Sequence, residues 1–253
     1  MFLRLVQAKV DPARSREFGK VYSDEIIPAL QGVKGCLYAG LWQSVHNLEE
    51  MVSLTLWASQ KYVDQYEQSG LYETLLGKSR PYFLERDEWK LHLSEDLRLE
   101  YSPVTEGPVV KSYDDASKSR KAVPEPIHAV CPFFRIVSML AQPGRIDDFK
   151  AVYYNDVLPA LRDVPGCCFV QLAQSVRDPN ESISFTVWKS ERDAEAYEST
   201  GMFAQLLGML KPTLSALFQW KMEEGDEPGR HSATSEDLLV HGYRIVTGMA
   251  FYG

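Results

Sequence analysis

Three pairs of aromatic side chains with a polar group are the residues in this chain best suited to chemistry. They are Tyr22 and Tyr153, Trp57 and Trp188, and Tyr66 and Tyr197. Such rings stack on a flat aromatic molecule while a hydroxyl or indole N–H hydrogen-bonds its oxygens. The same side chains also occur in cores whose polar tips reach water, and the two tryptophans fit that structural role as well.

Motifs for metals and cofactors do not stand out in the sequence. The five histidines share no spacing typical of metal ligands, and none recurs in the repeat described below; they are His46, His92, His128, His231 and His241. No nucleophile elbow, phosphate loop or dinucleotide fingerprint occurs. We therefore expect no metal and no bound cofactor, and we set aside the usual hydrolase, kinase and dehydrogenase interpretations.

The aromatic pairs belong to an internal repeat. Pro28-Ala29-Leu30 returns as Pro159-Ala160-Leu161, Gly35-Cys36 as Gly166-Cys167, and Trp89 as Trp220. The separation is 131 residues for each of them, so no insertion has entered the repeated part. The chain is therefore two copies of one module, and each position can be compared with its counterpart.

Each copy shows the pattern strand, helix, strand, strand, helix, strand. In the first copy the expected strands are Phe2 to Val10, Cys36 to Val45 and Met51 to Trp57, with a last core strand beginning near Trp89. The first helix follows Asp11-Pro12 and ends at Gly35, and its apolar residues recur at helical spacing. The second helix begins after Ser59, whose counterpart is Ser190.

This order is typical of the ferredoxin-like arrangement, an antiparallel sheet with both helices on one face. The other face must be covered, since an apolar patch of that size is unstable in water. Two copies can cover each other as an intramolecular pseudo-dimer with approximate two-fold symmetry, and further association of chains into a homo-oligomer stays open. We predict α+β modules at residues 1–102 and 131–253, the second with a C-terminal extension. The Ser-, Lys-, Asp- and Pro-rich residues 103–130 are predicted to be a linker, and Leu238 to Tyr252 an added strand or hairpin.

Composition places the chain among globular proteins, with 45% hydrophobic and 25% charged residues. The net charge of −8 argues against nucleic acid as a partner. No apolar run approaches the ~20 residues that cross a bilayer, and no leader pattern is seen at the N-terminus. The expected location is the cytoplasm, without a membrane partner.

The most characteristic stretch runs from Thr55-Leu56-Trp57-Ala58-Ser59 into Tyr66-Glu67-Gln68-Ser69-Gly70-Leu71. Together with the first strand, Pro28-Ala29-Leu30 and Gly35-Cys36, it resembles the antibiotic biosynthesis monooxygenase family of the dimeric α/β-barrel superfamily. The second copy carries the same hallmarks from Thr186 to Met202. The resemblance covers both copies and leaves the linker and tails unexplained.

The haem-degrading branch of that family can be compared position by position. It needs an asparagine in the first strand, a tryptophan in the second helix and an axial histidine further along that helix. The matching residues are Leu5, Tyr66 and Leu76 in the first copy and Ile136, Tyr197 and Leu207 in the second. Leucine cannot ligate iron, so haem degradation of that kind is not expected.

The resemblance instead implies cofactor-independent oxygenation of a small aromatic or quinol compound. The anion of such a substrate reduces O₂ directly, and the protein supplies a dry pocket with a proton acceptor or hydrogen-bond donor. We assign Tyr66 and Tyr197 as candidate catalytic residues. The candidate substrate-binding residues are Tyr22, Trp57, Tyr153 and Trp188. The alternatives are a non-catalytic module that binds a small ligand, as in a stress response, and a protein in which one copy is purely structural.

Two arginines in the first strands also recur, Arg4 and Arg135. The family comparison turns their strand face toward the opposite sheet. Because a buried arginine needs a partner, we expect an ion pair between the sheets, with a substrate-anchoring role as the alternative. Glu67 and Glu198 are expected to be surface charges, since one residue along a helix turns about 100° away from the neighbouring tyrosine.

Overall fold

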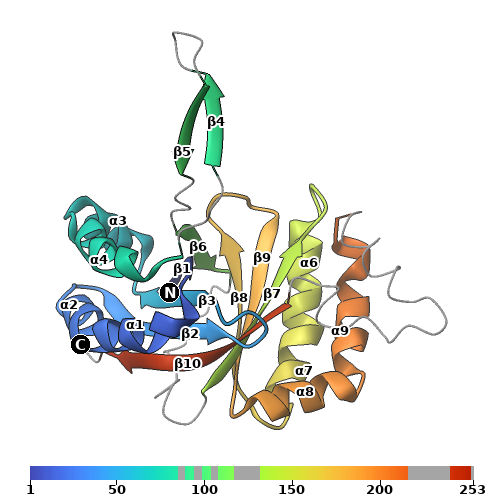
Figure 1. The fold of residues 1–253 in the computed structure, drawn as a ribbon. Helices are drawn as coiled ribbons and strands as arrows, with labels where there is room; N and C mark the ends of the chain where they lie inside the picture. The colour runs from blue at the N-terminus through green and yellow to red at the C-terminus, as the bar shows by residue number, and fades with distance from the viewer. Residues whose placement is uncertain (85–88, 94–98, 104–107, 117–131, 216–239, 252–253) are drawn as a thin grey trace.

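The computed structural model describes residues 1–84, 89–93, 99–103, 108–116, 132–215 and 240–251. Its main sheet is a closed antiparallel barrel, shown in Figure 1. Around the barrel the strands follow the order β1 (Phe2–Lys9), β3 (Glu50–Trp57), β2 (Cys36–Ser44), β10 (Val240–Ala250), β7 (Phe133–Leu140), β9 (Glu181–Trp188), β8 (Cys167–Ser175) and β6 (Val109–Asp115). The predicted fold class, tandem ferredoxin-like modules packed as an intramolecular α/β barrel, is confirmed.

Two helical layers flank the barrel, one for each module. The first contains α1 (Ser15–Val21), the π-helical turn η2 (Tyr22–Ile26), α2 (Ile27–Gln31), α3 (Gln60–Gln68) and α4 (Leu71–Ser79). The second contains α6 (Ile146–Val152), the π-helical turn η4 (Tyr153–Val157), α7 (Leu158–Arg162), α8 (Glu191–Ser199) and α9 (Met202–Leu210). Short 3₁₀ turns lie at η1 (Pro12–Arg14), η3 (Arg80–Tyr82) and η5 (Lys211–Thr213).

The fourth strand of each module is not where the sequence placed it. In the first module it is β6, which pairs with β1 and lies inside the stretch expected to be a linker. The strand that begins at Trp89, β4 (Trp89–Leu93), instead pairs with β5 (Leu99–Pro103) in a separate hairpin that projects from the barrel. In the second module the fourth strand is β10, which pairs with β7. The C-terminal segment predicted to be a strand or hairpin is thus the strand β10, and it pairs as the fourth strand of the second module.

The sequence pattern did not indicate β6 as a strand because its residues, Val-Val-Lys-Ser-Tyr-Asp-Asp, include few apolar ones. Residues 117–131 of the expected linker lie outside the described residues, and so does Trp220, where the repeat of the strand expected near Trp89 would begin. The boundaries 1–102, 103–130 and 131–253 stay a prediction.

β6 and β10 also join the modules. The far edge of β6 pairs with β8 of the second module, and the far edge of β10 pairs with β2 of the first. Each fourth strand is thus hydrogen-bonded on one side to its own module and on the other side to the partner module. This closes the barrel and leaves no open edge in it.

A proline shapes the first helical stretch of each module. Proline has no N–H to donate and breaks the regular i→i−4 pattern. Before Pro28 the helix widens by one residue, so that the N–H of Ile27 donates to the carbonyl of Tyr22. Leu158 and Tyr153 make the same contact in the second module. Such π-helical turns are frequent at functional sites, and both begin at a tyrosine singled out above.

The core divides into three clusters. Inward-facing residues such as Leu3, Leu5 and Phe134 fill the barrel. Outward-facing strand residues pack against the helices in two further clusters, one per module; Trp57 and Trp188 belong to these and are fully buried. Strand alternation thus separates the barrel interior from two helix–sheet interfaces.

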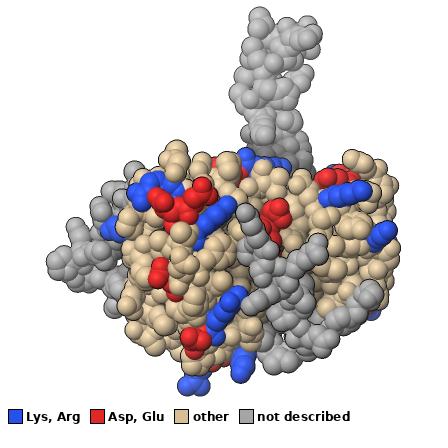
Figure 2. All heavy atoms as spheres, turned by 180° about the vertical axis from the view of Figure 1, so that it is seen from behind, with Lys and Arg blue, Asp and Glu red and all other residues tan. Residues whose placement is uncertain are grey.

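Acidic and basic side chains are interspersed over the described residues of the face seen in Figure 2. Within the described residues, no helix is long and apolar enough to cross a membrane.

The turn that leads into β8 requires a glycine, and a substitution there tests this requirement. Gly166 has φ of 87°, and a Cβ there would lie 2.5 Å from Cβ of Asp193. Gly166→Ala is therefore expected to lower the free energy of unfolding by about 1–3 kcal/mol, measured by denaturant titration. Gly208, in α9, has open space around it, so Gly208→Ala is the control and is expected to be neutral or stabilising. Equal losses in the two variants would contradict the explanation.

Candidate functional site

Each module encloses a small cavity between its helices and the outer face of its sheet. The cavity of the first module measures about 60 Å³ and that of the second about 40 Å³. Tyr22 and Tyr66 line the first, and Tyr153 and Tyr197 line the second. The structure therefore brings together the predicted tyrosines of each module, in two separate places.

The two first-helix tyrosines hold equivalent positions in these cavities. The Tyr22 hydroxyl lies 2.7 Å from Oγ of Ser53, and the Tyr153 hydroxyl lies 2.6 Å from Oγ of Ser184. Each serine comes from the third strand of its module, at the same repeat position. Burial raises the pKa of both tyrosines well above the ordinary value, so both hydroxyls keep their protons at neutral pH.

The two tryptophans are anchored as parts of the core. The indole N–H of Trp57 donates to Oγ1 of Thr55 at 2.9 Å, and Trp188 donates to Thr186 at the same distance. Trp188 lines the second cavity, whereas Trp57 does not line the first. Their rings instead pack against the second-helix tyrosines, with ring centroids 5.1 Å apart for Trp57 and Tyr66. Trp57 therefore contacts the ring of Tyr66 and holds it in place, and it does not itself line the first cavity.

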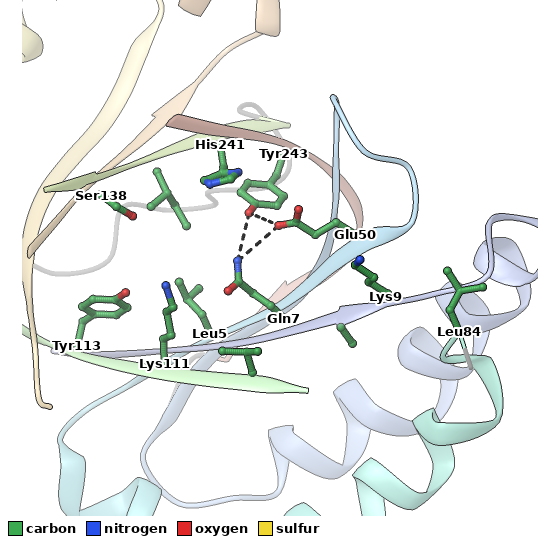
Figure 3. Close-up of a pocket in the computed structure, with 13 residues that line it drawn as sticks. Leu5, Gln7, Lys9, Glu50, Leu84, Lys111, Tyr113, Ser138, His241 and Tyr243 are labelled. Carbon is green, nitrogen blue, oxygen red and sulfur yellow. Dashed lines mark hydrogen bonds between the residues drawn. The ribbon is translucent and has the colours of Figure 1, made fainter. Parts of the chain in front are cut away.

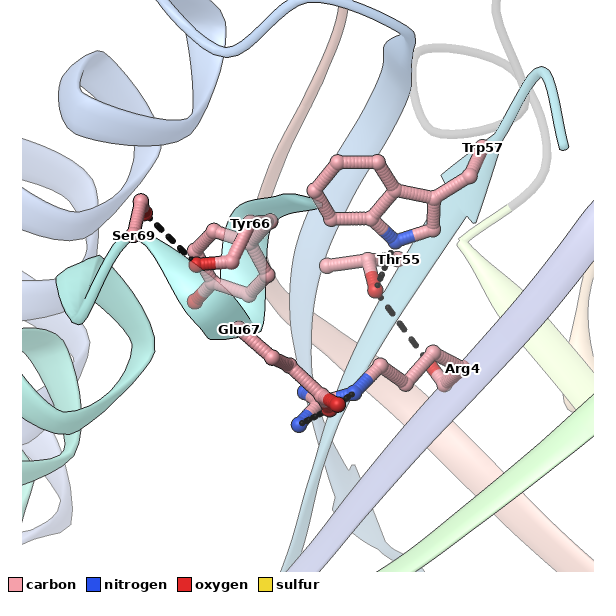
Figure 4. A network of polar contacts seen from close by, with 6 residues as sticks. All are labelled: Arg4, Thr55, Trp57, Tyr66, Glu67 and Ser69. Carbon is pink, nitrogen blue, oxygen red and sulfur yellow. Dashed lines mark hydrogen bonds and ion pairs between the residues drawn. The ribbon is translucent and has the colours of Figure 1, made fainter. Parts of the chain in front are cut away.

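The arginines do not make the expected ion pairs between the sheets. Nε and Nη2 of Arg4 donate to Oε1 of Glu67 on α3, at 3.1 and 2.8 Å (Figure 4). Arg135 pairs with Glu198 in the same way. The expectation was wrong because these strand positions face the helices and not the barrel interior. Glu67 and Glu198, expected to be surface charges only, are the partners of these buried arginines.

Arg4 reaches the first cavity beside two phenol rings. Its guanidinium lies 4.3 Å from the ring centroid of Tyr72 and 5.9 Å from that of Tyr66. Burial raises the pKa of Tyr66, and the charge of Arg4 opposes that rise without overcoming it. Within the described residues the Tyr66 hydroxyl has no hydrogen-bond partner. It can therefore donate a hydrogen bond to a bound molecule.

The two cavities differ at four paired positions, of which Ile26 and Val157 differ by one methylene and the other three differ more. Ala8, Tyr72 and Ser79 line the first, and their counterparts in the second are Met139, Phe203 and Leu210. Each of these three changes adds apolar volume or removes a hydroxyl. The first cavity is accordingly the larger and offers two more side-chain hydroxyls than the second.

No carboxylate or imidazole lines either cavity among the described residues. The described residues also contain no group of three or more His, Cys, Asp or Glu side chains that could hold a metal. Burial raises the pKa of the Cys36 thiol to about 12 and that of Cys167 to about 11, so neither thiol is ionised at neutral pH. Among the described residues, each cavity offers side-chain hydroxyls and one guanidinium, and the second also has the indole of Trp188.

Alkaline titration tests the buried tyrosines. Burial raises the pKa of eight described tyrosines, namely Tyr22, Tyr38, Tyr66, Tyr113, Tyr153, Tyr154, Tyr197 and Tyr243. In unfolded chains tyrosine ionises near pH 10, so the free energy of unfolding is expected to hold below about pH 10 and to fall above it. In the folded protein at about pH 11, tyrosinate absorbance should stay well below that of all 13 tyrosines. Full ionisation of the folded protein at that pH would contradict the burial described.

Removal of each glutamate partner tests the arginine pairs. The Glu198 side chain is 27% exposed and that of Glu67 is 44% exposed. Glu198→Ala is expected to destabilise by about 1–3 kcal/mol, and Glu67→Ala by less, because Glu67 is the more exposed and Arg4 lies closer to the ring of Tyr72, at 4.3 Å, than Arg135 does to that of Phe203, at 5.4 Å. Glu25, which pairs with Lys78 on the surface, is the control, with a change of about 0.5 kcal/mol or less for Glu25→Ala. The reverse order, measured by denaturant titration, would contradict this account.

Comparison with known families agrees with the internal repeat. The family model for antibiotic biosynthesis monooxygenases matches residues 1–76 and 132–207, one segment in each module. No curated protein matches the chain.

Three solved structures share the whole arrangement at low sequence identity. A presumed monooxygenase from Fusobacterium nucleatum is 9% identical with a TM-score of 0.64, over 100% of this chain and 95% of that one. A presumed monooxygenase from Lactobacillus acidophilus is 8% identical with a TM-score of 0.61, over 98% and 95%. A protein described as anthrone oxidase-like is 11% identical with a TM-score of 0.59, over 98% and 92%. At these identities the likeness shows the fold alone.

Proposed function

Since this chain belongs to the antibiotic biosynthesis monooxygenase family, we propose that it oxygenates a small phenolic or quinol compound without a cofactor. The observation that carries the proposal is the cavity of the first module, where Arg4, Tyr22 and Tyr66 meet. Their groups suit a substrate that reacts as its own anion.

We propose the cytoplasm as the location of the protein.

The reaction draws its electrons from the substrate. In a phenol that carries a para methylene group, loss of a proton gives an anion that transfers electrons to O₂. One oxygen atom then becomes a carbonyl at the methylene carbon and the other leaves as water, so that R₂CH₂ + O₂ gives R₂C=O + H₂O. The substrate supplies all four electrons, and one of the similar structures is described as anthrone oxidase-like, which names a substrate of this type.

Arg4 favours the substrate anion by its charge. Tyr66 shows the effect, because a phenol in this cavity has its pKa raised by burial and lowered by Arg4. The Nη1 group of Arg4 has no acceptor within the described residues, so it can donate to a phenolate oxygen. Because burial keeps Tyr66 protonated, we assign it the role of hydrogen-bond donor to reduced oxygen and not that of a base. Tyr197 takes the same role in the second module.

The first module is the better candidate for turnover. Its cavity has the extra hydroxyls of Tyr72 and Ser79, and Met139 fills space in the second that Ala8 leaves open in the first. Even so, about 60 Å³ is less than the ~150 Å³ of a protein cavity that binds benzene. Substrate entry therefore requires the half-buried Tyr72 and Phe83 to move outward.

A binding protein without catalysis is the second candidate. It is favoured by the lack of any described carboxylate or imidazole on the cavity walls, since no side chain there serves as an ordinary general base.

Oxygen consumption by the metal-free protein separates these functions. We expect O₂ uptake above the autoxidation rate with one or more members of a panel of hydroquinones and polycyclic phenols. Thermal stabilisation by a panel member without O₂ uptake would support the binding protein instead. Silence in both measurements would contradict both functions.

The tyrosine hydroxyls are tested with the substrate found in that panel. Tyr66→Phe is expected to lower kcat roughly 10²-fold, because a hydrogen-bond donor to developing charge is lost. Tyr197→Phe is expected to have a smaller effect. Tyr62→Phe, on the same helix as Tyr66 but away from the cavity, is the control and should keep the original rate. An unchanged rate in both Tyr66→Phe and Tyr197→Phe would remove these hydroxyls from the mechanism.

A further inference from the structure

A third cavity lies inside the barrel, where β1 and β7 end and β6 and β10 begin. Its volume is about 340 Å³, much larger than the two helix–sheet cavities and within the range of ~300–1,000 Å³ typical of ligand sites. Figure 3 shows side chains from both modules converging on it. We call this space the mouth cavity; its walls include Leu5, Gln7, Lys111, Ile136 and Tyr243.

The mouth cavity lies on the pseudo-two-fold axis that relates the modules. Leu5 and Ile136 are equivalent in the repeat, and both form its apolar floor. Tyr113 and Tyr243 hold equivalent positions on the two fourth strands, since they pair with Leu3 and with its counterpart Phe134. A molecule in this cavity therefore touches both halves of the barrel.

Each of these tyrosines donates a hydrogen bond to a glutamate of the other module. The Tyr243 hydroxyl lies 2.7 Å from Oε1 of Glu50, and the Tyr113 hydroxyl lies 3.4 Å from Oε1 of Glu181. Nε2 of Gln7 lies 3.5 Å from the same Glu50 oxygen. The carboxylate of Glu50, which lines the cavity, is thus already held by groups of the protein.

The positive charges at the mouth cavity have no such partners. Lys9 and Lys111 line it from the neighbouring strands β1 and β6, and both are half-buried. No carboxylate lies within ion-pair distance of either ammonium among the described residues. His241 adds an imidazole on β10. The space therefore has an apolar floor, and its walls carry two lysine ammonium groups against the one carboxylate of Glu50, which lies on β3 opposite Lys9.

These charges belong to one side of the pseudo-symmetric cavity. The counterpart of Lys9 is Leu140, and that of Gln7 is Ser138. The position on β10 that corresponds to Lys111 carries His241, two residues before Tyr243 as Lys111 is before Tyr113. A duplicated core needs no lysine at these places, so the fold does not account for the concentration of cations on the first-module side.

We propose that the mouth cavity binds a small organic anion, a carboxylate with an apolar body. The carboxylate lies between the ammonium groups of Lys9 and Lys111, where charge-assisted hydrogen bonds are strong. The apolar body lies on Leu5 and Ile136. Because the walls come from both modules, the bound anion stabilises the closed barrel by mass action and raises its melting temperature as the anion concentration rises.

The first experiment compares anions with neutral molecules of the same shape. Benzoate, phenylacetate and octanoate are each titrated against their amides, with the melting temperature as the readout. We expect at least one carboxylate to raise the melting temperature and its amide to have little effect. An equal effect of acid and amide, or no effect of any carboxylate, would overturn the proposal.

The site is located by methyl NMR with isoleucine labels. Ile136 lines the mouth cavity and Ile26 lines the helix–sheet cavity of the first module. The stabilising carboxylate is expected to shift the Ile136 methyl signal and to leave that of Ile26 in place. A shift at Ile26 alone would place the ligand in the proposed oxygenation cavity and overturn the mouth site without bearing on the oxygenation.

The charge is tested by substitution. Lys111→Met keeps most of the side-chain stem and removes the ammonium, and it is expected to weaken binding of that carboxylate about tenfold. Lys9→Met is a second, independent variant with the same expectation. Lys34→Met, an exposed lysine away from the cavity, changes the net charge equally and should leave the Kd unchanged. Equal affinities in all three variants would overturn the proposal.

Discussion

Closure of the barrel is the constraint on which the rest of the structure depends. A four-stranded ferredoxin-like sheet has two open edges, and their unpaired backbone groups invite association with other chains. Here β6 and β10 each pair with their own module on one side and with the other module on the other side. The two sheets therefore share all their edges, and their apolar inner faces form one core.

Strand alternation then places the candidate ligand sites on two different faces of the sheets. The outer face of each sheet meets the helices, and there the arginine, the first-helix tyrosine and the second-helix tyrosine converge once in each module. The inner face is apolar through most of the barrel and becomes polar at one end, where both modules contribute to a single cavity. The helix–sheet cavities consequently come as a pair, one per module, while the described residues of both modules together form the mouth cavity.

The two modules share the hydrogen bonds that support their cavities but differ at several residues that line them. The hydrogen bonds of Tyr22 with Ser53 and of Trp57 with Thr55 recur at Tyr153 and Trp188 with almost the same lengths. In contrast, Tyr72 corresponds to Phe203 and Lys9 corresponds to Leu140 at positions that line cavities in the first module. Within one chain, the residues that support the cavities are retained and several that line them differ, which favours unequal roles for the two modules.

The sequence by itself determined the two copies, the order of their first elements and the aromatic pairs, because a constant separation and local periodicity are properties of the chain alone. It also indicated the turns at Gly35 and Gly166, where only a residue without a Cβ fits the backbone. Tertiary structure decided which segment became the fourth strand, since the polar β6 is a strand only through pairing with β1 and β8. It also decided that Arg4 faces the helices, because alternation says which residues share a face but not what covers it. The mouth cavity depends on residues as far apart as Gln7 and Tyr243, and only the closed barrel brings their side chains within 3.5 Å.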